Sequence, residues 1–179
     1  DTLMARTTDV YKSLDSRIEE ANRNNCTYYV SIHLNAGKGD GAETYFTVMR
    51  GVGEDLAENI LNEIAKTGQN IDRGTKMRVN QYGTDYYAVI RGTNMPATIV
   101  ECAFVDNATD LKILATEGQR KDMGIAIAKG ILKTLGVAIQ SEKGTLYRVQ
   151  VGAYLVKANA EAMQKKIKAV GFDAFIVKE

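Results

Sequence analysis

Two apolar runs of strand length place the strongest constraint on the fold of this chain. The first covers residues 27–35 and ends near His33, the only histidine among the 179 residues. The second covers residues 96–107 and is interrupted near its carboxyl end by one carboxylate, Glu101. Because segments of helical periodicity alternate with these and other strands, the pattern is typical of an α/β fold. We expect three layers, in which a mostly parallel, twisted sheet carries helices on both faces.

The local signals define the predicted elements. Thr8 can cap a first helix, whose apolar positions include Tyr11 and Leu14. Asn107 is placed to cap a short helix, and Gly136 to end a long one. The predicted strands cover residues 2–6, 27–34 and 42–49 and the run that Pro96 opens, and longer helices are expected over residues 53–67 and 119–135.

His33 and Glu101 are the two candidate functional residues. Strand alternation puts His33 on one face with Ser31, and Glu101 on one face with Ile99. If the two strands are parallel neighbours, the imidazole and the carboxylate converge at the carboxyl edge of the sheet, where open α/β sheets bind ligands. The alternatives are a satisfied core or surface histidine, and a buried glutamate paired with an arginine.

Several motifs occur in a recognisable order and spacing. They are SIHLNA at 31–36, GAETY at 41–45, RGTK at 73–76, VIR at 89–91 and the run at 96–107, preceded by residues 3–9 and by Leu14, Arg17, Ala21 and Asn22. Together they resemble the zinc-dependent N-acetylmuramoyl-L-alanine amidases of the type 3 family. The resemblance covers about residues 1–137.

The resemblance implies a chemistry for both candidate residues. His33 matches a histidine that holds the family's zinc ion, and Glu101 matches its catalytic glutamate. One Zn²⁺ per complete active site would lower the pKa of a bound water to about 7 and polarise the amide carbonyl. Glu101 would take the proton from that water and return it to the departing amine. The bond cut would join N-acetylmuramic acid to the first L-alanine of the stem peptide.

The chain departs from the family pattern at its beginning. The family's Gly-His-Gly-Gly histidine and its ligand glutamate have no counterpart here, so the other zinc ligands are absent from this chain. We expect a fragment that lacks about fifty N-terminal residues, and the alternative is a degenerate domain that cannot hold zinc tightly. Cys26 and Cys102 form no Cys-x-x-Cys pair and are interpreted as small buried hydrophobic residues.

A polar stretch at residues 70–94 is a candidate substrate-binding region. Guanidinium groups pair with carboxylates and aromatic rings stack on sugars, so this stretch could hold the stem peptide or the glycan. The alternative is a solvated connection, and the sequence does not select individual residues. The candidates are Arg73, Lys76, Arg78, Tyr82, Tyr86, Tyr87 and Arg91.

A second module follows the amidase-like region. We expect a catalytic domain over 1–137, a linker over 138–144 and a small C-terminal βαβ unit over 145–179, with strands at 146–154 and 172–177 and a helix at 158–169. The motif YRVQVGAY at 147–154 resembles the opening of a SPOR domain, a module that binds glycan strands stripped of stem peptides. Only the first half of such a domain is matched, and the alternative is a packing appendage.

The two modules together predict a bacterial peptidoglycan hydrolase of the cell wall or extracellular space. The rival is a non-catalytic peptidoglycan-binding protein with a degenerate zinc site. No nucleic-acid partner is expected, because 23 Lys and Arg face 22 Asp and Glu. No apolar run approaches the ~20 residues of a membrane span. A Rossmann-type cofactor enzyme is not supported, because the chain has no Gly-x-Gly-x-x-Gly at a strand-to-helix turn.

Overall fold

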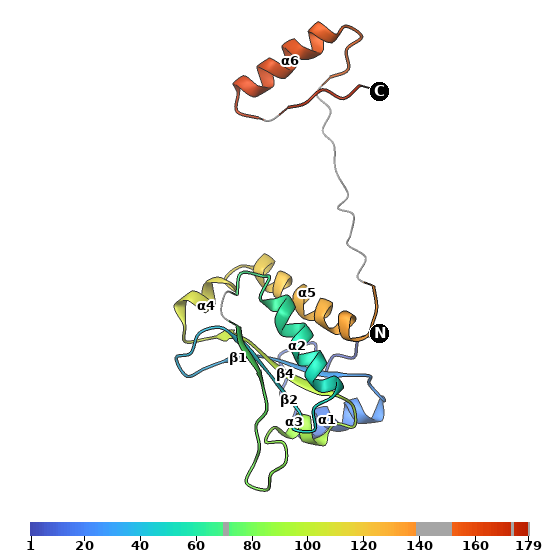
Figure 1. Cartoon of the computed structure of the whole chain (residues 1–179), viewed down its shortest axis with the longest axis vertical. Helices are drawn as coiled ribbons and strands as arrows, with labels where there is room; N and C mark the ends of the chain where they lie inside the picture. Colours follow the sequence, from blue (N-terminus) through green and yellow to red (C-terminus); the bar gives the residue numbers. More distant parts are fainter. Residues whose placement is uncertain (70–71, 139–151, 173, 179) are drawn as a thin grey trace. The chain divides into compact units, whose positions relative to one another are not determined.

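The chain is divided into two compact units. The computed structural model describes residues 1–69, 72–138, 152–172 and 174–178. The units are Asp1–Ile139 and Gln140–Glu179 (Figure 1). The predicted domain boundaries stay predictions, because most of the linker region lies outside the described residues.

A mixed four-stranded sheet forms the centre of the first unit. Its strands lie in the order β1 (Tyr29–Asn35), β4 (Ala97–Phe104), β2 (Ala42–Phe46) and β3 (Asp72–Lys76). β1 pairs with β4 and β2 with β3 in parallel, whereas β2 and β4 are antiparallel. The connection between β1 and β2, at 36–41, is too short for a parallel crossover, which needs a dozen or more residues, so β2 runs opposite to β1. Because β4 is parallel to β1, β2 and β4 are antiparallel.

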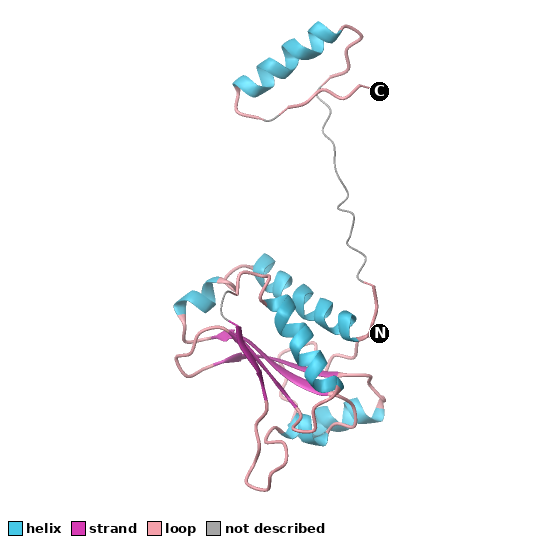
Figure 2. Cartoon of the chain, viewed as in Figure 1, coloured by secondary structure: helices cyan, strands magenta, loops and turns pink. Residues whose placement is uncertain are grey.

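Helices cover both faces of this sheet, as the sequence predicts. α2 (Val52–Ile64) and α5 (Glu117–Thr134) lie on one face, and α1 (Leu14–Arg23) and α3 (Ala88–Gly92) lie on the other (Figures 1 and 2). α4 (Ala108–Lys112) follows β4 directly. The three-layer α/β fold is therefore confirmed.

Two separate cores fill the spaces between the layers. On the α2 and α5 side, the buried residues include Leu56, Ile60, Val100, Cys102 and Ile127. On the α1 and α3 side, the buried core residues are Val89, Ile90, Ala97 and Ile99, against which Ile18, Tyr29, Tyr45 and Tyr87 pack. Alternate residues of β4 therefore face opposite cores, and the α1 and α3 side is also the face of Glu101.

Two local predictions at the beginning of the chain are wrong. Residues 2–6 form no strand, since they pair with none of the strands in the described part of the chain. The first helix begins at Leu14 rather than after Thr8, because the side chain of Ser13 accepts a hydrogen bond from Ser16 N and caps it. Tyr11, one of the apolar positions assigned to that helix, lies before its first residue and is 91% exposed.

Two of the later helices, α4 and α5, begin at side-chain caps. Asn107 caps α4 by accepting from the backbone of Thr109 and Asp110, as predicted. Thr116 and Gln119 form a reciprocal capping box at the start of α5. By contrast, β3 and α3 lie in the polar stretch at 70–94, for which no strand or helix is predicted from the sequence.

Within its described residues, the second unit contains one helix, α6 (Lys157–Ala169), which agrees with the predicted helix at 158–169. The final strand predicted at 172–177 is wrong for its described residues, since 172 and 174–177 form no strand. A strand needs a paired neighbour, and the described residues provide none. The other predicted strand falls mainly on residues outside the description. No helix in the described ranges is long and apolar enough to cross a membrane.

Candidate functional site

Three ionisable side chains lie in a row across one face of the sheet. His33 on β1 is the register partner of Glu101 on β4, which is in turn the partner of Glu43 on β2. Register partners of paired strands share a face. The structure therefore brings the two predicted residues together on neighbouring parallel strands and adds a second carboxylate beside them.

Glu101 has no ion-pair partner among the described residues. Its Oε2 atom is buried and makes no hydrogen bond. Burial, followed by the negative charge of Glu43, raises the pKa of Glu101 above its ordinary value. Because no arginine pairs with Glu101 in the described part of the chain, the alternative interpretation of an arginine-paired glutamate is not supported. A buried carboxylate oxygen without a partner is costly and therefore calls for another explanation.

His33 is exposed on its strand rather than enclosed in a core. Its Nε2 atom lies 2.8 Å from Ser31 Oγ. Partial burial, followed by the positive charge of Arg17, lowers the pKa of His33. The imidazole is therefore neutral and accessible at pH 7, and a neutral imidazole can act as a metal ligand.

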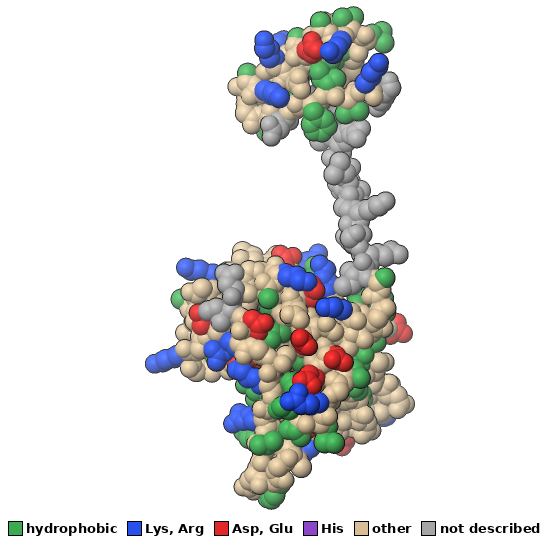
Figure 3. Space-filling model, viewed as in Figure 1, with side chains coloured by type: hydrophobic (Ala, Val, Ile, Leu, Met, Phe, Trp, Pro, Cys, Tyr) green, Lys and Arg blue, Asp and Glu red, His purple; other side chains and the backbone are tan. Residues whose placement is uncertain are grey.

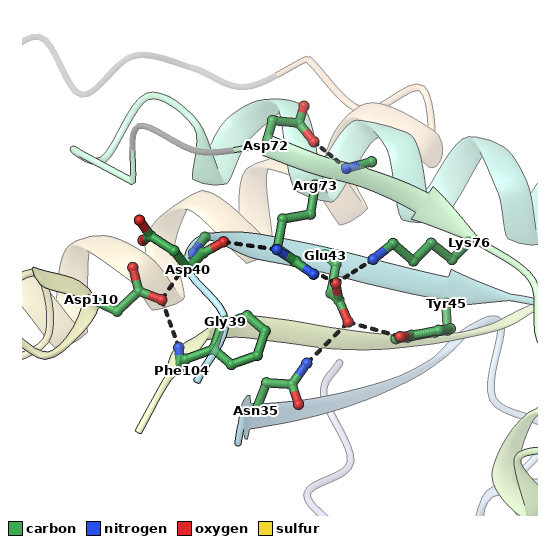
Figure 4. A network of polar contacts seen from close by, with 12 residues as sticks. Asn35, Gly39, Asp40, Glu43, Tyr45, Asp72, Arg73, Lys76, Phe104 and Asp110 are labelled. Carbon is green, nitrogen blue, oxygen red and sulfur yellow. Dashed lines mark hydrogen bonds and ion pairs between the residues drawn. The ribbon is translucent and has the colours of Figure 1, made fainter. Parts of the chain in front are cut away.

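Glu43 is the most heavily bonded side chain of the row, and Figure 4 shows its contacts. Its Oε1 atom accepts from Asn35 Nδ2 at 3.0 Å and from the Tyr45 hydroxyl at 2.7 Å. Its Oε2 atom accepts from Arg73 Nε at 2.7 Å and from Lys76 Nζ. Only 4% of the side chain is exposed, so Glu43 is a buried carboxylate with charged donors from β3.

These contacts fix the protonation state of Glu43. Burial by itself would raise the pKa of Glu43, but hydrogen bonds from Lys76, Arg73 and Tyr45 outweigh it and lower the pKa to about 2. The pKa of Tyr45 is raised, first by burial and then by its hydrogen bond to Glu43. A permanent negative charge therefore lies directly beside Glu101.

Glu43 belongs to the GAETY motif at 41–45, but the sequence alone predicts no role for it. The available signal is a glutamate at an alternating position in a strand of buried residues, since both neighbours, Ala42 and Thr44, are buried. Its charged partners, Arg73 and Lys76, are about thirty residues away in the sequence, and only the fold brings them together.

Two aspartates hold the loop at 36–41, which connects the His33 strand to the Glu43 strand. Asp106 Oδ2 accepts from the backbone N–H groups of Gly37 and Lys38, both at 2.8 Å. The buried Asp110 accepts from the backbone of Gly41 and Phe104 through Oδ2, at 3.0 and 2.7 Å. The loop therefore has a defined conformation at the edge of the row.

The cysteines lie apart from this row. Cys102 is buried in the core on the α2 and α5 side, as predicted, and Cys26 is partly buried. Burial, followed by the charge of Glu101, raises the pKa of Cys102 to about 12. Both thiols are free, and within the described residues no group of three or more His, Cys, Asp or Glu could hold a metal ion. His33 therefore fits as one metal ligand but not as a complete site.

The surface charge agrees with the composition. On the face seen in Figure 3, basic and acidic side chains are interspersed and form no broad patch of one sign.

Comparison with known proteins gives matches over both modules. The model of the N-acetylmuramoyl-L-alanine amidase family matches residues 1–133, and the SPOR-domain model matches residues 111–178. The SPOR match begins earlier than the predicted module, and α5, which it includes, packs against α2 in the first unit.

Individual relatives resemble the chain over much of its length. A sporulation-specific N-acetylmuramoyl-L-alanine amidase of Bacillus subtilis is 32% identical over 176 residues, which cover 98% of this chain and 66% of that protein. Cwp6 from Clostridium difficile is similar in structure, with a TM-score of 0.72 and 38% identity over 74% of this chain and 22% of that chain.

A further structural relative is the catalytic domain of CwlV, an N-acetylmuramoyl-L-alanine amidase from Bacillus (Paenibacillus) polymyxa. It gives a TM-score of 0.62 at 27% identity and covers 77% of this chain and 74% of that chain. Since the family model spans residues 1–133 and the fold agrees, the chain belongs to the N-acetylmuramoyl-L-alanine amidase family.

Proposed function

We propose that this protein hydrolyses the amide bond between N-acetylmuramic acid and the first L-alanine of the peptidoglycan stem peptide. The observation that carries the proposal is the pairing of His33 with Glu101 on neighbouring parallel strands, where Glu101 keeps a buried oxygen without a partner. Membership of the amidase family supplies the reaction class.

Glu101 acts as the general base and then as the general acid. Its pKa is raised by burial and by Glu43, which makes its carboxylate a better proton acceptor than an ordinary glutamate. The free Oε2 atom takes the proton of the attacking water, and the same proton passes to the departing L-alanine amine. The products are a free lactyl carboxylate and a free stem peptide.

Zinc is part of the proposal, and His33 is one of its ligands. When bound, zinc polarises the amide carbonyl and lowers the pKa of its water. The exposed, neutral imidazole of His33 suits this role, whereas the described residues supply no set of three ligands. The proposal is therefore one zinc ion per complete active site, with other ligands from outside the described residues.

The SPOR match supports a targeting role for the C-terminal region. We propose that it binds glycan strands from which stem peptides have been removed, so that the protein stays on the wall that it cleaves. The proposed location is the cell wall or the extracellular space.

The assignment of Glu101 is tested by its substitution with glutamine. We expect Glu101→Gln to abolish the release of stem peptides from purified cell wall and to leave the zinc content unchanged. Glu58→Gln is a matched control, because Glu58 is exposed on α2, which covers the opposite face of the sheet. Wall cleavage that persists in Glu101→Gln would refute the general-base role.

The zinc assignment is tested by elemental analysis of His33→Ala. The wild-type protein, with its complete ligand set, should hold about one zinc per chain, and His33→Ala should lose it. If the wild type takes up no zinc on reconstitution and binds wall without cleaving it, the non-catalytic alternative replaces the proposal.

A further inference from the structure

Four cationic side chains in the region from 70 to 94 are candidates for binding an anionic part of the substrate. The structure commits three of them to other groups. Arg73 and Lys76 are bonded to Glu43. Arg91 donates from Nη1 to the backbone carbonyls of Asp85, at 2.5 Å, and Tyr86, at 3.0 Å. The charged groups of Arg73, Lys76 and Arg91 are therefore bonded to other groups of the protein rather than left for a ligand.

Arg78 is the exception. Its guanidinium carbon lies 3.8 Å from the centroid of the exposed Tyr86 ring and 5.9 Å from that of Tyr87, with which it also hydrogen-bonds. No carboxylate in the described part of the chain forms an ion pair with it. Asp85 is close in sequence but accepts from Val48 N and Thr47 Oγ1, both at 2.8 Å.

A chain of contacts joins Arg78 to the row of ionisable side chains. The rings of Tyr87 and Tyr45 meet edge to face with centroids 5.0 Å apart. The hydroxyl of Tyr45 donates to Glu43, the strand partner of Glu101. Arg78 also follows Lys76, the last residue of β3, by two positions. Two aromatic rings, those of Tyr87 and Tyr45, therefore lie between the guanidinium and Glu43 in this chain of contacts.

The exposed group at this position is a cation rather than a bare aromatic face. The guanidinium covers one face of Tyr86, so a sugar ring cannot stack on that face. A guanidinium that lies over an aromatic ring can still direct N–H donors at the two oxygens of a carboxylate. An extended peptide advances about 3.3–3.6 Å per residue, so a stem peptide of several residues reaches well beyond its scissile bond.

We propose that Arg78, positioned by Tyr86 and Tyr87, binds a free carboxylate of the stem peptide and selects substrates that carry one. This inference rests on the proposed function, because it takes the stem peptide as the ligand. Amidation of that carboxylate removes the charge that the guanidinium recognises.

The test measures binding separately from cleavage. A disaccharide-peptide with free stem-peptide carboxylates, and the same compound with those carboxylates amidated, are titrated calorimetrically into the full chain carrying Glu101→Gln, so that neither is hydrolysed. Arg78→Gln and Arg78→Lys are then added to this background. Lys129→Gln is the control for lost charge, since Lys129 is exposed on α5.

We expect Arg78→Gln to raise the Kd of the free-carboxylate compound by about tenfold, since a charge-assisted pair is lost. Arg78→Lys should recover part of the affinity, and the amidated compound should bind all variants equally. A similar loss for both compounds, a loss shared with Lys129→Gln, or no binding of the free-carboxylate compound would overturn the proposal. Stem-peptide release by the wild type is scored separately, so failure of the proposed hydrolysis is distinguished from failure of Arg78.

Discussion

Glu43 and Glu101 are neighbouring carboxylates in opposite electrostatic environments. Glu43 has two cationic donors and a pKa of about 2, whereas Glu101 has a buried oxygen without a partner and a raised pKa. Pairs of carboxyl groups whose pKa values are driven apart by their surroundings are characteristic of acid–base sites. The same contrast gives each residue a distinct effect on stability.

For Glu101, we expect the substitution that removes activity to stabilise the fold. The raised pKa means that its contribution to stability is present below about pH 4.5 and is lost as the pH rises through the folded-state value. In metal-free protein at pH 7, Glu101→Gln should therefore gain about 1 kcal/mol, or roughly 2–4 °C in Tm. Thermal unfolding at pH 4 and pH 7 checks this, and a lower Tm for Glu101→Gln at pH 7 would contradict it.

For Glu43, the sign is reversed. Its lowered pKa means that its contribution to stability is present above about pH 4.5 and is lost as the pH falls towards 2. Because Arg73 and Lys76 are each about one third exposed, we expect Glu43→Gln to cost about 2 kcal/mol at pH 7, less than a fully buried pair. Urea unfolding of both proteins from pH 7 to pH 2 should show the difference shrinking below pH 4.5. A constant difference would contradict the account.

His33 and Glu101 can be identified as candidate functional residues from the sequence, because each is an ionisable residue in an apolar run. The sequence does not single out Glu43 or Arg78 as functional residues in the same way. Glu43 keeps its negative charge because β3 supplies its cationic partners. Arg78 differs from Arg73 in that Arg73 is paired with a carboxylate, whereas Arg78 lies over an aromatic ring. Such information depends on tertiary contacts rather than on residue type or spacing.

At the scale of elements, α2 and α5 can pack backbone to backbone because α5 has a glycine, Gly130, at the contact. A Cβ atom added to Gly130 on α5 would lie 2.7 Å from the backbone N of Ile60 on α2. Separations under 3.0 Å from backbone cannot be relieved by a side-chain rotation, so one helix would have to move. The position of α2 on the sheet is therefore sensitive to Gly130.

We expect Gly130→Ala to destabilise the protein by about 1–3 kcal/mol, because overpacking outweighs the better helix propensity of alanine. Gly124→Ala is the matched control, since Gly124 lies in the same helix with nothing within 4 Å of its added Cβ. It should stabilise by up to about 1 kcal/mol. Denaturant unfolding of the two variants separates the effects, and equal shifts of the same sign would refute the packing argument.

Helices and strands are predicted correctly where a local sequence signal coincides with a packed position in the fold. The helix that Asn107 caps and the strand that follows Pro96 have both a signal and such a position. The prediction fails for residues 2–6, which find no strand partner, and for β3, whose sequence DRGTK has no apolar alternation. β3 exists because β2 offers it a parallel edge.

At the scale of the whole molecule, the proposed function gives the two units different tasks, with support from the amidase and SPOR matches. We expect a chain ending at Ile139 to lose most of its affinity for glycan strands stripped of stem peptides, while the full chain sediments with them. In the zinc-loaded protein with its complete ligand set, turnover of a short soluble disaccharide-peptide should not change when the region after Ile139 is removed. Equal co-sedimentation of both chains with stripped glycan would assign binding to the first unit instead.

The central claim is that His33 and Glu101 belong to one site that cuts a single amide bond. Mass spectrometry of the soluble products after digestion of purified peptidoglycan by the zinc-loaded protein tests it most directly. The account predicts free stem peptides with an amino-terminal L-alanine, together with glycan strands whose sugar linkages are intact. Products with new reducing ends, or peptides cut within the stem, would contradict it.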